Sequence, residues 1–207
     1  MLDPKYNSKE TAIASYSFSE ITTASGYIVF YLGKTVDLNL MSNNTFYSDM
    51  VATASANMGI SADAIRLDND FDVLINQPLT FQGKGIITIP LGVSRSGSSN
   101  SGYAVVKLRK WDGTTETEIC NNTSRTWANN AASGYTYTML AVDLEVPQTS
   151  FKVGEYLRIT IEIWGAGGAD PSYVAYAHDP KGRTTGWDAT GAVPSILTAQ
   201  IPVKIDL

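Results

Sequence analysis

Strict alternation of apolar and polar side chains is the feature that most constrains the fold of this 207-residue chain. From Leu157 to Ile163, every second residue is leucine or isoleucine, and Arg158, Thr160 and Glu162 stand between them. Because successive side chains of a β-strand point to opposite faces, the apolar residues share one face. The segment 155–164 is therefore predicted to be a half-buried strand with its polar side chains toward solvent.

Similar alternation, stronger or weaker, recurs along most of the chain. The predicted strands are 26–32, 45–53, 71–75, 85–93, 103–109, 115–120, 139–146, 155–164, 173–178 and 197–207. A short helix is expected over 55–65, where Ser61 can cap a turn. Residues 1–15 show no period and are expected to form an N-terminal arm or extended tail.

Turn signals separate these strands. Asp112-Gly113 predicts a hairpin, and the Ser/Gly-rich stretches 93–102 and 165–171 predict loops. Pro90 and Pro202 fall inside strand patterns. Because proline cannot donate a ladder hydrogen bond, these two strands are expected to be sheet edges or to carry bulges.

The chain contains neither a dividing linker nor a repeat at a period of 20–50 residues. Hydrophobic residues make up 43% of it, which is enough for a buried core. We expect an all-β fold in which residues 16–207 form a single-domain antiparallel β-sandwich. Long strand spacing and uneven loops favour a jelly-roll-like topology.

Composition excludes several classes of function. A net charge of −5 argues against a nucleic-acid partner, and no apolar run approaches the ~20 residues of a membrane span. One cysteine and one histidine cannot supply a cysteine cage or a two-histidine metal site, and no cofactor motif occurs. The first residues lack a signal-peptide pattern, so synthesis in a reducing cytoplasm is expected.

Two groups of residues could carry chemistry. His178 beside Asp179 could act as a general acid or base, alone or paired with Cys120, but the segment also fits a polar turn and the cysteine a buried position. Asp68, Asp70 and Asp72 alternate, which could serve calcium or simply share a solvent face of a strand. We favour the structural interpretation in each case and expect no catalytic or metal-binding residue.

Aromatic residues are the candidate interface or glycan-stacking groups. The candidates for this role are Trp164, Trp187, Tyr173 and Tyr176. Trp164 lies on the polar face of its predicted strand. The alternative is that such rings fill the core, where they bury a large apolar area.

Four stretches resemble those of a known group of proteins. They are KLRKWDGTTETEI (107–119), YLRITIEIW (156–164), YVAYAHDPKGRT (173–184) and PVKIDL (202–207). Together they resemble virion structural proteins, namely capsid decoration, turret or tail-associated proteins of environmental tailed phages and related viruses. The resemblance covers roughly residues 70–207 and is carried by β motifs.

The resemblance implies a non-enzymatic virion protein, such as a capsid decoration, cement or turret subunit. Such a subunit would self-associate, most simply as a homotrimer, and would bind other capsid proteins of the shell. The alternative is a carbohydrate-binding β-sandwich that recognises a host glycan. An enzyme that uses His178 with Asp179 or Cys120 is a third possibility.

Overall fold

The computed structural model describes residues 25–55, 57–58, 61–96, 100–129, 131, 133–168 and 171–204. The expected all-β fold is confirmed, because these residues form strands and loops and contain no helix. The expected arm, residues 1–15, and the start of the expected domain, 16–24, lie outside the described residues. The described part of the chain also has no helix long and apolar enough to cross a membrane.

The described residues form twelve strands. They are β1 (Ser25–Lys34), β2 (Asn39–Ser42), β3 (Ala52–Ala54), β4 (Ser61–Leu74), β5 (Leu79–Ser96), β6 (Asn100–Trp111), β7 (Glu116–Thr123), β8 (Trp127–Asn129), β9 (Ser133–Phe151), β10 (Tyr156–Gly167), β11 (Val174–Ala177) and β12 (Leu197–Lys204).

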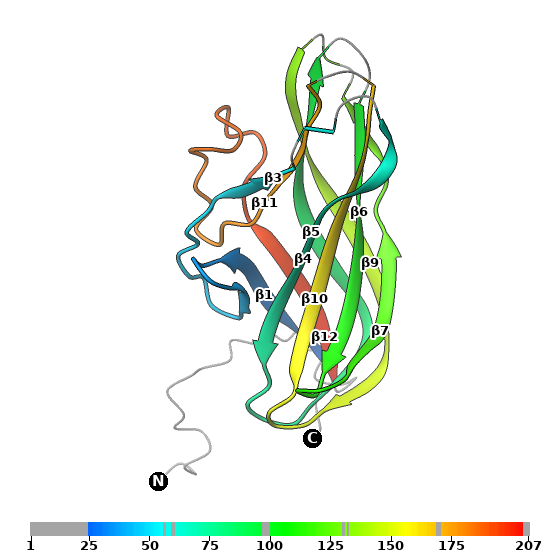
Figure 1. Ribbon diagram of the computed structural model, residues 1–207. Coiled ribbons are helices and arrows are strands. Elements are labelled where there is room, and N and C mark those ends of the chain that lie inside the picture. Colours follow the sequence, from blue (N-terminus) through cyan, green and yellow to red (C-terminus); the bar gives the residue numbers. More distant parts are fainter. Residues whose placement is uncertain are drawn as a thin grey trace.

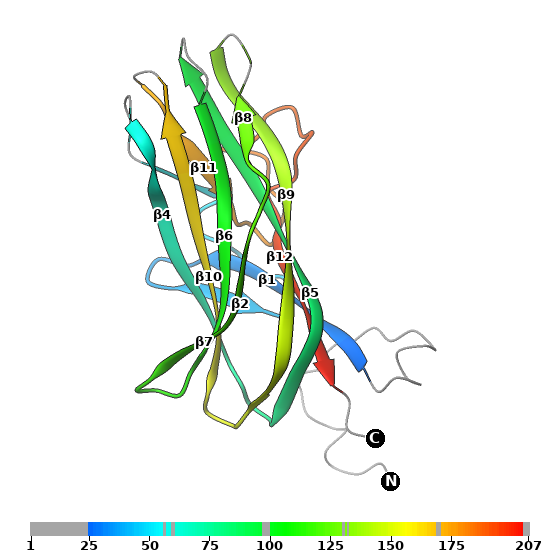
Figure 2. The ribbon, with the colours of Figure 1, turned by 90° about the vertical axis from the view of Figure 1, so that its right-hand side faces the viewer.

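The strands lie in two packed layers (Figures 1 and 2). One layer has the order β4-β10-β6-β7, and the other contains β9, β5, β12 and β1, with β11 and β3 beside the upper part of β5. Pairing is antiparallel except where β2 meets β4 in one parallel bridge, between Leu40 and Asp72. This bridge joins the layers into one folded sheet.

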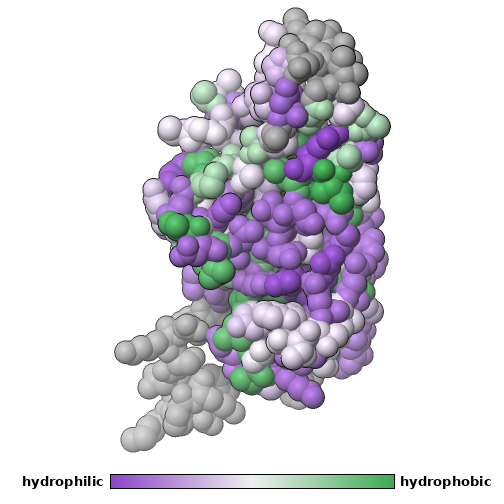
Figure 3. Space-filling view, in the orientation of Figure 1, coloured by the Kyte–Doolittle hydropathy of each residue, from purple (hydrophilic) through white to green (hydrophobic). Residues whose placement is uncertain are grey.

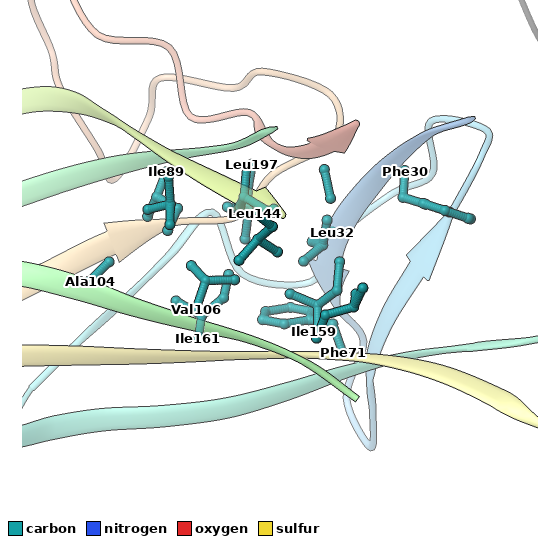
Figure 4. Packing of buried hydrophobic residues seen from close by; sticks show 14 of the residues in the cluster. Phe30, Leu32, Phe71, Ile89, Ala104, Val106, Leu144, Ile159, Ile161 and Leu197 are labelled. Carbon is teal, nitrogen blue, oxygen red and sulfur yellow. The ribbon is translucent and has the colours of Figure 1, made fainter. Parts of the chain in front are cut away.

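The core lies between the two layers. Ile159 and Ile161 of β10 face the opposite layer, from which Ile89 and Leu144 project toward them (Figure 4). All four side chains have 0% exposure. The alternation predicted for the segment 155–164 is therefore confirmed on its apolar side.

Both prolines lie in central strands, where the local ladder is interrupted. Pro90 of β5 lies where that strand changes partner, after Thr88 pairs with β12 and before Leu91 pairs with β11. Pro202 of β12 lies at the register shift opposite β5. The expectation of a bulge is confirmed at Pro202, and neither strand is an edge of the sheet.

Several predicted boundaries are wrong. The helix expected over 55–65 is absent from the described residues of that range, and Ser61 begins β4 instead. The loops expected at 93–102 and 165–171 are shorter, because β5, β6 and β10 extend into them. Backbone pairing with a long neighbouring strand outweighs the turn preference of serine and glycine there. Residues 45–51, expected to be a strand, form a loop.

Candidate functional site

His178 follows β11 and is buried, with 1% of its surface exposed. Its Nε2 atom lies 2.8 Å from Oγ1 of Thr53, and its Nδ1 atom has no hydrogen-bond partner among the described residues. Burial lowers the pKa of His178 to about 4, and the charge of Lys34 acts in the same direction. The ring is therefore neutral near neutral pH, and a substrate in solution has no access to it.

Asp179 serves the loop that follows, and it does not orient His178. Its carboxylate is completely buried and accepts hydrogen bonds from the Arg183 side chain at 2.7 Å and from the Arg183 backbone N–H at 2.8 Å. Burial opposes ionisation, but the hydrogen bonds from Arg183 outweigh it and lower the pKa of Asp179. This geometry agrees with the polar-turn interpretation of the segment.

Cys120 cannot be the partner of His178. It lies on β7, opposite Leu108 of β6, whereas His178 follows β11 on the other side of the molecule (Figure 1). Burial raises the pKa of the Cys120 thiol to about 11, so the reactive thiolate is scarce at neutral pH.

The outer face of the β4-β10-β6-β7 layer carries a ladder of charges. Arg158 of β10 forms two hydrogen bonds of 2.7 Å with Asp72 and an ion pair of 3.3 Å with Asp70. Asp68 stands opposite Glu162, one step further along the strands. These aspartates thus share the outer face of β4, and in the described part of the chain no group of three or more acidic, histidine or cysteine residues is placed to hold a metal ion.

Glu162 departs from the expected solvent position. Its exposure is only 5%, although it lies on the outer face of β10. It forms an ion pair with Lys107 and accepts a hydrogen bond of 3.1 Å from Nε1 of Trp164. The Trp164 ring stacks on Tyr103, with ring centroids 6.0 Å apart. Long neighbouring side chains therefore cover this acid, and together they form a small network.

The four aromatic candidates do not share one surface. Trp164 is half-buried on the outer face of β10, and Tyr173 is half-buried just before β11. Tyr176 has 1% exposure within the main core, and Trp187 has 7% exposure against the edge of Tyr137. Tyr176 and Trp187 thus offer no open ring face to a glycan, which corrects that part of the expectation.

A group of exposed apolar side chains lies in segments for which the sequence pattern predicted no functional site. Val36 and Leu38 in the β1–β2 turn are 83% and 61% exposed, and Tyr47 and Met50 in the loop after β2 are 63% and 43% exposed. Backbone contact ties the two segments together, because the Asp49 N–H donates to the Lys34 carbonyl at 2.7 Å. We call these four apolar residues the hairpin patch.

Figure 3 shows hydrophobic groups on this edge of the molecule, to the left of the hydrophilic central face. Valine and leucine on either side of Asp37 in a two-strand turn were the available signal in the sequence. This pattern indicates exposed apolar side chains only when the position of the turn is known, because apolar residues in such a turn cannot enter the core.

No family model and no curated protein matches the chain. Among solved structures, it is similar to a CocE/NonD family hydrolase from Staphylococcus aureus, with a TM-score of 0.51 and 13% identity over 87% of this chain and 37% of the other. An α-amino acid ester hydrolase scores 0.54 with 10% identity, covering 86% and 36%. An aminopeptidase from a marine sediment Thaumarchaeota archaeon scores 0.55 with 8% identity, covering 87% and 37%.

These matches correct the expected function. The chain spans little more than a third of the length of each neighbour, and at such low identity the likeness shows the fold alone. The neighbours are nevertheless hydrolases and an aminopeptidase, so the expectation of a virion structural protein, with a glycan-binding module as its alternative, is overturned. The expected homotrimer and the virion location stay predictions. The comparisons therefore show that this chain has a β-fold of a kind that also occurs within hydrolases.

Proposed function

We propose that this chain is a non-catalytic β-domain of a hydrolase assembly, which docks on a catalytic unit through the hairpin patch. The single observation that carries the proposal is that about 86% to 87% of this chain matches only 36% to 37% of each hydrolase neighbour. In those proteins, the remainder of the chain accompanies the region that this fold resembles. A domain of this kind would therefore need a separate catalytic unit as its partner.

The groups able to act in hydrolysis support a non-catalytic role. His178 is buried and Cys120 lies on another strand, on the other side of the molecule. Asp179 is engaged by Arg183, and Glu162 by Lys107. A nucleophile needs a base within hydrogen-bond reach and a path for substrate. His178 does lie 2.8 Å from the Thr53 hydroxyl, but its ring is buried, so this pair lacks the path for substrate.

The hairpin patch has the composition of a docking surface. Tyr47 and Met50 are residue types that are enriched at protein interfaces. The four exposed apolar side chains lie on two segments that a backbone hydrogen bond joins. Arg183 lies over the Tyr47 ring at 4.3 Å, which fixes the ring beside the loop. Asp37 and Asp49 are exposed at its margin, so a partner with a basic rim is expected.

The test compares hydrolase activity that co-purifies with three tagged full-length chains from the cells that produce them. They are the wild type, Val36→Asp/Leu38→Asp, and Val153→Asp, which changes a 62%-exposed valine in the turn between β9 and β10. Ester or aminoacyl hydrolysis should accompany the wild type and Val153→Asp and be lost with the double variant. Equal activity in all three captures, or none in any, would overturn the proposal.

A further inference from the structure

A cavity of about 520 Å³ opens at the side of the sandwich, between the β1–β2 hairpin and the loop that joins β4 to β5. Its position follows from the sheet topology. β2 pairs with β1 only from Tyr31 to Lys34 and with β4 only through Leu40, so the two layers part beyond these contacts. The volume lies within the range of about 300–1,000 Å³ that is usual for small-molecule sites.

The buried residues that line the cavity are apolar. They are Phe30, Met41 and Ile75, with exposures of 5%, 3% and 3%. Val73 and Leu79 line its walls and are half-buried. The apolar body of a ligand would therefore leave water on entering, which is the main source of affinity in such sites.

The mouth of the cavity is polar but uncharged. Asn43, Asn44, Asn76 and Gln77 line it with side-chain amides, each of which can both donate and accept hydrogen bonds. No aspartate, glutamate, lysine, arginine or histidine is among the lining residues. A charged ligand would lose hydration here without gaining an opposite charge.

We infer that this cavity binds a small uncharged molecule with an apolar body and one hydrogen-bonding head, such as an amide, an aromatic amine or an alcohol. The apolar body lies on Phe30 and Met41, and the head reaches the amides of Asn76 and Gln77. This inference does not depend on the docking role, because the cavity lining shares no residue with the hairpin patch.

Two fluorescent probes test the charge selectivity. N-phenyl-naphthylamine is neutral and carries one N–H group, and anilinonaphthalene sulfonate has the same aromatic body with an added negative charge. Titration of the full chain should show saturable binding of the neutral probe at one site, and at least about tenfold weaker binding of the sulfonate. Equal affinity for the two probes, or no saturable binding of the neutral one, would overturn the inference.

Two matched variants place the probe. Leu74 and Ile65 are both on β4 and are 43% and 45% exposed, but only Leu74 lines the cavity. Leu74→Arg should weaken binding of the neutral probe about tenfold or more, and Ile65→Arg should leave it unchanged. Asn76→Trp, which narrows the mouth without touching a strand, repeats the test if Leu74→Arg does not fold. If the affinity for the neutral probe were unchanged in both cavity variants, the probe would not bind in this cavity.

Discussion

The Nε2 atom of His178 lies 2.8 Å from the Oγ1 atom of Thr53, and the ring that carries it is 1% exposed. This pairing holds the loop after β11 against β3. The contact engages one ring nitrogen of the only histidine of the chain.

His178 should make stability depend on pH. Its pKa in the folded protein is about 4, below the ordinary 6.5, so the unfolded chain takes up the proton first as pH falls. Its contribution is therefore complete above the unfolded value and is lost as pH falls toward the folded value. From about pH 7 to about pH 5 this amounts to about 2 kcal/mol.

Urea unfolding at both pH values measures this contribution. His178→Gln is the matched control, because glutamine can keep the bond to Thr53 and does not titrate. The wild type should lose about 2 kcal/mol more than His178→Gln over this interval. Parallel losses in the two proteins would show that His178 is protonated equally in both states.

Glu162→Ala should destabilise the protein, in contrast to what its place on a polar strand face predicts. The change leaves Lys107 without its partner on a covered surface and removes the acceptor for Trp164 Nε1. The expected loss is about 2 kcal/mol, below the value for a fully buried pair because Lys107 remains partly exposed. Denaturant unfolding gives the number, with the exposed Glu118 on β7 as control. A loss no larger than that of Glu118→Ala would contradict the network.

Gly92 should not tolerate a methyl group. An added Cβ would lie 2.9 Å from the Tyr137 ring and 3.3 Å from Trp187. Gly92→Ala should cost about 1–3 kcal/mol and shift the fluorescence of Trp187, because overpacking displaces rings. In a Tyr137→Ala background most of this cost should vanish. An equal cost in both backgrounds would locate the clash elsewhere.

Prediction from sequence succeeded where the period of the strand decides the outcome. Ile161 lies in the core as its alternation requires, and Ile161→Asp should prevent folding. The burial of its neighbour Glu162 does not follow from the alternation, because burial on an outer face depends on the length of side chains from adjacent strands. Pairing register, which determines that Lys107 stands beside Thr160 and reaches Glu162, has no local signature in the sequence.

The site was less predictable than the fold. Tyr176 lies on β11, where all four residues are buried, so both faces of that strand are covered and alternation carries no information. The cavity depends on where the pairing of β1 with β2 ends. The hairpin patch depends on the position of the turn after Lys34. Each is a property of the assembled sheet, and short sequence windows do not contain it.

The proposed docking role requires that the domain itself does not catalyse hydrolysis. The most direct measurement is the turnover of nitrophenyl esters and aminoacyl nitroanilides by the purified chain, compared with His178→Gln and Cys120→Ser. Rates equal to those of buffer are expected for all three proteins. Turnover that rises in proportion to the concentration of the chain and disappears in either variant would contradict it.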